Sequence, residues 1–121
     1  MAQHNDFGKW GELVAADYLK ANGYFVQYHD WRIGHKDIDL VAVDNSTKEL
    51  VFVEVKTRRN AVFARPEDSI DRDKTRNLLS AIRAYLTINK PKRKFRFDVV
   101  TVIGTDDTNV QINHMRDCRL I

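Results

Sequence analysis

The chain has 121 residues, of which 43% are hydrophobic and 31% are charged, and its formal net charge is +3. This length suits one domain with a single sizeable core, and the composition is typical of a soluble globular protein. The sequence has no apolar run long enough for a transmembrane helix, no signal-peptide pattern at its start and one cysteine, Cys118, which excludes an intramolecular disulfide. We therefore expect a single domain over residues 1–121 in the reducing cytoplasm.

The first half of the chain predicts one helix and three strands. We expect residues 1–6 to be a flexible start and residues 8–21 to form a helix that ends before Gly23, because apolar residues recur there at helical spacing. Alternating apolar residues predict strands that follow, with polar turn residues between the last two. The expected strands are residues 24–28, with an extension towards Ile33 beyond a break at Asp30, then 37–43 and 50–57.

The second half predicts one helix and two more strands. A loop through Pro66 precedes a helix over residues 68–88, and Pro91 lies in the break that follows it. Strands are expected at residues 97–103 and 110–114. The order helix, three strands, helix, two strands indicates a mixed sheet of about five strands with helices packed on it, an α/β or α+β domain.

The second and third strands carry charges where apolar residues are expected. Side chains alternate along a strand, so Glu54 and Lys56 share one face with Phe52, and Asp37 and Asp39 share a face on the neighbouring strand. If the two strands pair with these faces aligned, Asp39 and Glu54 converge with Lys56 beside them. Mg²⁺ prefers such carboxylate oxygens, and a lysine beside it can position water or stabilise phosphoryl charge. The alternative is a structural ion pair between Asp39 and Lys56.

Two basic runs flank this pattern, "KTRR" at residues 56–59 and "KPKRKFR" at residues 90–96. Each can neutralise phosphates, and each can equally be a solvated loop. Trp10, Trp31 and Phe95 could stack on bases, although burial explains the tryptophans as well. Gly8 and Gly11 could permit close approach of a backbone or phosphate to the first helix, and they could equally mark a loose N-terminus.

In this order the motifs resemble those of a known family. They are "GKWGELVAADYLKANGY" (residues 8–24), "DIDLVAV" (37–43), "LVFVEVKTR" (50–58), Lys74 and "RFDVV" (96–100). The arrangement of Asp39 with Glu54-Val55-Lys56 resembles the PD-(D/E)xK nuclease superfamily, which includes restriction endonucleases and archaeal Holliday-junction resolvases. The whole set looks like the YraN-like family of predicted endonucleases. The resemblance implies a restriction endonuclease-like fold.

The resemblance also implies roles for individual residues. Asp39 and Glu54 match the metal-binding acids, Lys56 matches the catalytic lysine, and Glu12 matches a first-helix glutamate that approaches the metal in related nucleases. The implied metal is Mg²⁺ or Mn²⁺. Basic positions that could contact the nucleic acid are Lys74, Arg58, Arg59 and Arg96.

Several of these residues have simpler interpretations. Glu12 could be an exposed residue of an amphipathic helix, Lys74 an ordinary surface lysine, and Arg96 a partner of Asp98 on its own strand. One departure concerns Asp37: the family reads Gly-Glu-Ile-Asp here, whereas this chain reads "GHKDID". The side chain at position 37 is therefore one methylene shorter than the family's glutamate.

Three functions remain open at this stage. The favoured one is a metal-dependent endonuclease that hydrolyses DNA phosphodiesters, with branched or structured DNA as the implied substrate and a homodimer as a reasonable assembly for cutting two strands. The second is a non-catalytic nucleic-acid-binding module on a nuclease-like fold. The third is a structural or partner-binding protein that reuses the fold.

Overall fold

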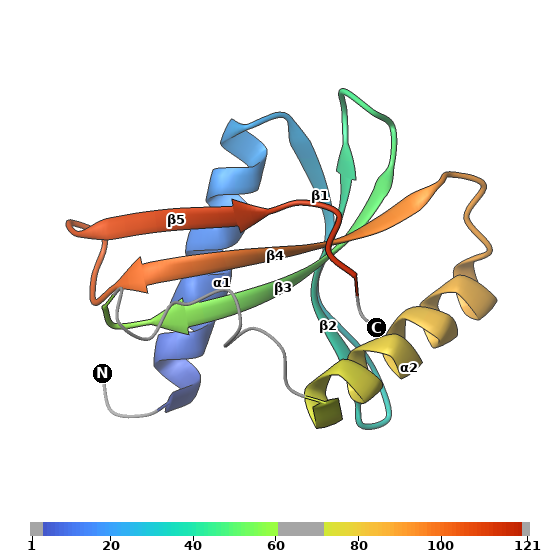
Figure 1. Cartoon of the computed structure of the whole chain (residues 1–121), viewed down its shortest axis with the longest axis horizontal. Helices are drawn as coiled ribbons and strands as arrows, with labels where there is room; N and C mark the ends of the chain where they lie inside the picture. The colour runs from blue at the N-terminus through green and yellow to red at the C-terminus, as the bar shows by residue number, and fades with distance from the viewer. Residues whose placement is uncertain (1–3, 61–71, 120–121) are drawn as a thin grey trace.

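The computed structural model describes residues 4–60 and 72–119. Within them, five strands form one sheet in the order β1-β2-β3-β4-β5, with β3 and β4 parallel and the other neighbours antiparallel (Figure 1). Helix α2 lies between β3 and β4 in sequence and supplies the long connection that a parallel pair requires. The predicted α+β class and element order are confirmed. The elements are α1 His4–Ala21, β1 Tyr24–Ile33, β2 Lys36–Asp44, β3 Leu50–Arg58, α2 Arg72–Asn89, β4 Phe95–Gly104 and β5 Val110–Met115.

The predicted boundaries need two corrections. Helix α1 begins at His4, so residues 4–6, expected in a flexible start, are helical. Strand β1 runs unbroken to Ile33, so the break expected at Asp30 does not end the strand. The strand is irregular instead: its register against β2 shifts between Val26 and Tyr28, and Asp30 has a positive φ of 51°. The expected loop through Pro66 and the first four residues of the expected second helix, 68–71, lie outside the described residues.

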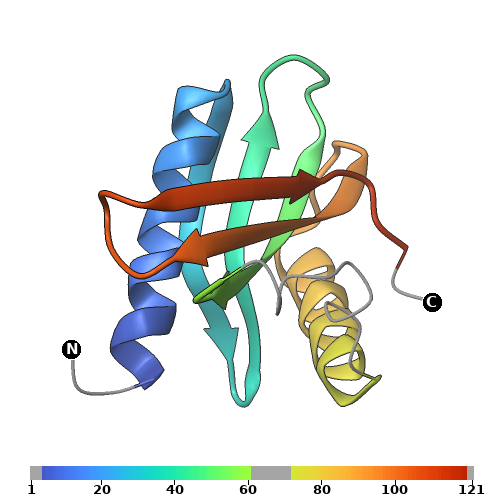
Figure 2. The same ribbon diagram turned by 60° about the vertical axis from the view of Figure 1, so that its left-hand side comes forward.

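The two helices cover opposite faces of the sheet, as Figure 2 shows. Ala15, Ala16 and Leu19 of α1 are buried against Val51, Val53 and Val55 of β3. On the other face, α2 packs on the side of β3 that carries Phe52. The alternation predicted for β3 is therefore confirmed: its valines face α1, and the face with Phe52 carries Glu54 and Lys56 towards α2. The α2 residues buried there are Leu78, Ala81, Ile82 and Tyr85.

A tight hairpin fixes the register of β2 against β3. The Asp44 carboxylate accepts hydrogen bonds from the backbone N–H and the hydroxyl of Ser46, at 2.9 and 2.8 Å, and Lys48 takes a positive φ of 69°. The register that follows pairs Val43 with Leu50 and Leu40 with Val53. This turn therefore sets which residues of β2 and β3 come together at the far end of the hairpin.

Candidate active site

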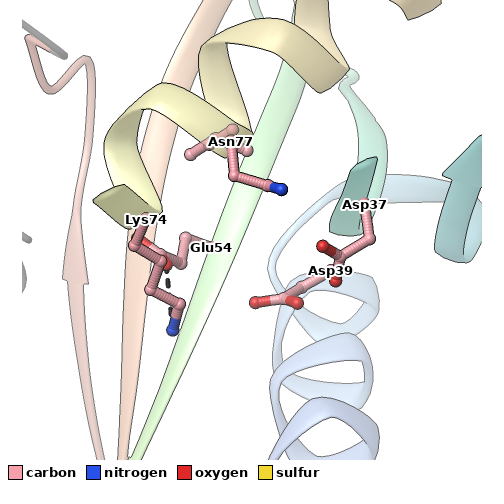
Figure 3. A pocket seen from close by; sticks show the side chains of 6 residues that line it. Asp37, Asp39, Glu54, Lys74 and Asn77 are labelled. Atoms are coloured by element: carbon pink, nitrogen blue, oxygen red, sulfur yellow. Dashed lines mark ion pairs between the residues drawn. The ribbon is translucent and has the colours of Figure 1, made fainter. Parts of the chain in front are cut away.

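A pocket opens at the end of the β2–β3 pair that lies farthest from the hairpin turn. Asp37 and Asp39 reach it from β2, Glu54 from β3, and Lys74 and Asn77 from α2 (Figure 3). Leu78 of α2 completes the lining. The structure thus brings together the two acids that the sequence predicted to converge, and places Lys74 directly beside them.

Asp39 occupies the point where β2 and β3 stop pairing. The paired residues of the two strands end at Leu40 and Val53, and beyond them Asp39 Oδ2 accepts a hydrogen bond of 2.8 Å from the Val55 backbone N–H. The side chain therefore takes over a contact that a strand backbone would otherwise make, which holds the carboxylate in the gap between the strands. Burial, followed by the nearby Glu54 carboxylate, raises the pKa of Asp39 from 3.8 to about 6, although the Val55 hydrogen bond opposes the rise.

Glu54 is buried and lies between two lysines. Its Oε1 is 3.2 Å from Lys74 Nζ and 3.5 Å from Lys56 Nζ. Lys56 is only 6% exposed, and burial lowers its pKa even though Glu54 opposes the change. Burial also acts to lower the pKa of Lys74, but there the Glu54 carboxylate prevails and the pKa is raised. The sequence predicted Lys56 beside the two acids and offered an Asp39–Lys56 ion pair as the alternative. The carboxylate that pairs with Lys56 is that of Glu54, and Lys74 shares it.

Glu12 approaches the acids from the α1 side of the sheet. Burial and the carboxylate of Asp39, with smaller contributions from Asp30 and Asp37, raise the pKa of Glu12 from 4.5 to about 7. Glu12 is therefore electrostatically coupled to Asp39 and is not a remote surface residue. Asp39 thus interacts electrostatically with both of the other predicted acids, Glu12 and Glu54.

The donor chemistry of this region suits a hard divalent cation. Mg²⁺ needs only one or two protein carboxylates and keeps several waters, and Asp39 and Glu54 supply two. The raised pKa values of Asp39 and Glu12 indicate an excess of desolvated negative charge, which a cation would relieve. Within residues 4–60 and 72–119, however, no three acidic, histidine or cysteine side chains are arranged to hold a metal ion by themselves. The residues fit a cation held by two carboxylates and water.

Arg96, predicted to contact phosphate, lies elsewhere. Register places Arg96 and Asp98 beside Val51 and Val53, on the α1 face, opposite Glu54. Arg96 is 7% exposed. It donates to three carboxylates at 2.9 to 3.0 Å, those of Asp44, Glu49 and Asp98, and to the Tyr24 hydroxyl at 2.8 Å. These buried contacts remove Arg96 from any phosphate surface, and the alternative that it pairs with Asp98 is the one observed.

The other predicted basic residues follow Lys56 along β3. Arg58 ends the strand and donates to the Thr57 carbonyl at 3.0 Å. Arg59 is exposed, and its Cζ lies 4.7 Å from the centre of the Phe7 ring of α1. These two residues extend positive charge from the pocket past the end of the strand.

Sequence reasoning missed Asn77 and the partners of Arg96 other than Asp98. Asn77 follows Lys74 by three residues on α2, a spacing that puts both on one helix face, so helical periodicity could have found it. Its side chain also donates to the His35 carbonyl at 3.1 Å and ties α2 to the β1–β2 turn. The contacts of Arg96 with Asp44 and of Asp98 with His114 join residues far apart in the sequence. No local pattern could therefore predict them.

Fold and site together define an α+β protein with an acid–lysine pocket where two core strands separate. The family described as "Uncharacterised protein family UPF0102" matches residues 11–102. The chain is 42% identical to a UPF0102 protein of Bacteroides thetaiotaomicron over 117 residues, 97% of this chain and 94% of that one. UPF0102 proteins of Bacteroides fragilis and Flavobacterium psychrophilum are 40% and 33% identical, with 97% of this chain and 94% and 96% of theirs covered. The chain belongs to the UPF0102 family, the YraN-like family that its motifs resemble.

Proposed function

We propose that the protein is a metal-dependent endonuclease of the PD-(D/E)xK superfamily that hydrolyses DNA phosphodiester bonds. The observation that carries the proposal is the meeting of Asp39, Glu54, Lys56 and Lys74 where β2 and β3 separate. The carboxylates of Asp39 and Glu54 provide for a cation. The ammonium groups of Lys74, which lines the pocket, and of Lys56, which pairs with Glu54, provide for a phosphate. No helix of the described part of the chain is long and apolar enough to cross a membrane.

Asp39 and Glu54 are the residues that would hold Mg²⁺ or Mn²⁺. When bound, the ion supplies Lewis acidity for phosphodiester hydrolysis. Asp39 is already oriented for this by the Val55 N–H, which leaves its other oxygen for a ligand. Glu12 interacts electrostatically with Asp39 from the α1 side and would add negative charge that favours the same ion. A preorganised carboxylate costs little to bring into position when the ion arrives.

The two lysines have different tasks in this proposal. Lys56 is buried beside Glu54 and can orient the attacking water or donate to a phosphoryl oxygen, as a fixed ammonium does. Lys74 has a side chain 55% exposed to solvent, so it can leave Glu54 and follow an incoming phosphate. Arg58 and Arg59 would neutralise phosphates farther along the strand.

The substrate preference is taken from the resolvase resemblance. We propose branched or structured DNA, with a homodimer placing two sites on two strands. The test incubates the protein with labelled single-stranded, duplex, flap and four-way-junction DNA in Mg²⁺, Mn²⁺ or EDTA. We expect cutting in metal and none in EDTA, with the junction or flap cut fastest.

Variants assign the activity to the pocket. Glu54→Gln and Lys56→Met should each lower the cutting rate at least about 100-fold, the usual effect of removing a group that acts in the transition state. Asp17→Asn, an exposed acid of α1, is the matched control and should cut like the wild type. Equal cutting by Glu54→Gln and the control would refute the assigned site.

A non-catalytic nucleic-acid-binding module is the second candidate. It is favoured by the Lys74–Glu54 contact, which neutralises one of the two proposed ligands, and by the lack of a three-ligand cluster in the described residues. This candidate predicts salt-sensitive DNA binding that survives Glu54→Gln, with no cutting of any substrate. The same assays separate the two functions.

A further inference from the structure

A row of stacked side chains lies where the start of α1 meets the end of β3, and its two aromatic residues have no role in the chemistry proposed above. Phe7 and Trp10, one turn apart on α1, stack with ring centres 5.7 Å apart and planes 18° from parallel. The Arg59 guanidinium lies over Phe7 at 4.7 Å. Both rings are half-buried, and Arg59 is exposed. Aromatic rings and guanidinium planes in this arrangement are the surfaces on which unpaired bases stack.

The row is held rigidly. The Trp10 indole N–H donates to the Asp107 carboxylate at 2.7 Å, which fixes the ring from the β4–β5 turn. Gly11, the next residue, packs so closely on β3 that a Cβ there would overlap the Thr57 side chain. These contacts pack the first turns of α1 against the end of β3. Arg59 is the first residue after that strand. A preorganised stack loses little freedom when a ligand binds.

The row lies within reach of a strand bound at the acids. Arg59 is three residues beyond Lys56, about 10 Å along an extended chain. That span corresponds to about three nucleotide steps of a duplex strand. On α1, Glu12 follows Trp10 by two residues and senses the charge of Asp39. A nucleic-acid strand that meets both the acids on the α2 face and the row on the α1 side would pass the end of β3.

Gly8 gives independent support for a ligand at this end of α1. Glycine disfavours a helix interior relative to alanine, yet among the described residues nothing lies within 4 Å of a Cβ built at Gly8. Packing within residues 4–60 and 72–119 thus gives no reason for a glycine at this position, in contrast to Gly11. Gly8 is one turn before Glu12, on the same side of the helix. A missing side chain there leaves room for a nucleic-acid backbone.

We infer that Phe7, Trp10 and Arg59 form a base-binding subsite for an unpaired nucleobase of the strand being cut, and that its backbone crosses Gly8. The inference rests on the proposed function, because it takes the phosphate that is cut to lie at the Asp39–Glu54 pocket. It gives a physical reason for preferring structured DNA, because junctions, flaps and single strands offer unpaired bases and an intact duplex does not.

The test measures anisotropy of a labelled single-stranded oligonucleotide in EDTA, so that no cutting occurs. One oligonucleotide carries bases throughout, and a second of equal length and charge carries a central run of abasic sites. The wild type should bind the first about 5- to 150-fold more tightly, the affinity equivalent of one stacked base. Equal affinity for both would overturn the inference.

Arg59→Lys separates stacking from charge, since lysine keeps the positive charge but lacks the guanidinium plane. It should weaken binding of the base-containing strand several-fold and leave the abasic strand unchanged. Phe7→Leu should do the same, while Arg83→Lys on α2 is the matched control and should keep the full preference. No change on either strand with Arg59→Lys would mean that Arg59 acts by its charge alone, and equal weakening on both strands would mean that its guanidinium contacts the backbone; either result would overturn the subsite.

Gly8→Leu tests the path of the backbone. It should leave the melting temperature unchanged or raised and weaken both oligonucleotides several-fold; unchanged binding would overturn that path. The cutting assay is separate from these measurements. Metal-dependent cutting without a base preference overturns only the subsite, whereas a base preference without cutting overturns only the nuclease.

Discussion

Asp39 carries its charge in surroundings that are poorly suited to it. It is held by one backbone N–H beside the carboxylates of Glu54 and Asp37, and its pKa is raised to about 6 by burial and by these neighbours. A carboxylate that is costly to ionise in the folded protein weakens the fold near neutral pH. Perturbed carboxylates in pockets are often functional for this reason.

Replacement of this carboxylate should therefore stabilise the protein while removing its metal response. Asn in place of Asp39 retains an oxygen that can accept from Val55 N–H but carries no charge. We expect Asp39→Asn to increase the free energy of unfolding at pH 8 by about 2 kcal/mol in metal-free buffer, measured by urea denaturation. Asp17→Asn provides the control. A less stable Asp39→Asn protein would show that the charge is structural.

The same residue sets the pH dependence of stability. A raised carboxylate pKa means that the folded state binds the proton more tightly, so stability from this group falls as pH rises from about 4 to about 6. Glu12, with a pKa of about 7, extends the fall to about pH 7. Thermal melting of the wild type across pH 4 to 8 without metal should show this decline, and Asp39→Asn should reduce it. A decline of equal size in both proteins would contradict the assignment.

Among the elements, α1 has two glycines in different environments. Gly11 meets the Thr57 side chain of β3, while Gly8 has no close neighbour among the described residues. Alanine is preferred over glycine in helices by about 1 kcal/mol, and forced overpacking costs about 1–3 kcal/mol. The contact at Gly11 therefore determines how closely α1, with Glu12, approaches the sheet.

The two alanine substitutions should have opposite effects. Gly8→Ala should stabilise by about 0.5–1 kcal/mol and Gly11→Ala should destabilise by about 1–2 kcal/mol, both from denaturant midpoints. Adding Thr57→Ala to Gly11→Ala should recover part of the loss, because it removes two of the three closest side-chain atoms. Stabilisation by Gly11→Ala would mean that the helix is not docked as described.

At the scale of the whole molecule, a buried charge network ties the sheet together behind the pocket. Arg96 on β4 bonds to Asp44 at the end of β2, and Asp98 accepts from Arg96 and from the backbone N–H of Asp117 and lies 2.8 Å from His114 Nε2. Although burial opposes the change, hydrogen bonds from Ser46 and then Arg96 hold the pKa of Asp44 below its usual range, and those from His114, Arg96 and the Asp117 backbone do the same for Asp98. Strands β2, β4 and β5 are thereby connected.

Breaking this network should be costly. Arg96→Met leaves buried carboxylates without their shared cation and should destabilise by about 3–5 kcal/mol, whereas the exposed Arg93→Met should change stability by less than about 0.5 kcal/mol. Because the pKa values of Asp44 and Asp98 are lowered, their contribution is present above about pH 4 and is lost as pH falls below it. Urea denaturation of both variants at pH 7 measures the difference. Similar losses from the two would show that the network contributes little.

The sequence predicted much of the fold because its strongest signals are local. The valines of β3 alternate with Phe52, Glu54 and Lys56. This period of two predicts that Glu54 and Lys56 lie on the sheet face opposite the valines, as observed. Arg96 was misplaced although the same period was available, because Arg96, Asp98 and Val100 share the face of the α1 core. The gap at Asp39 could not be predicted, since it depends on where two strands cease to pair.

The most direct measurement is a calorimetric titration of Mn²⁺ into the wild type and Asp39→Asn at pH 7.5. The account predicts saturable binding to the wild type, with proton release as Glu12 and Asp39 lose residual protons, and at least about tenfold weaker binding to Asp39→Asn. Binding of equal strength to both proteins, or no binding to the wild type, would contradict the claim that the charges on these core strands are there to bind a cation.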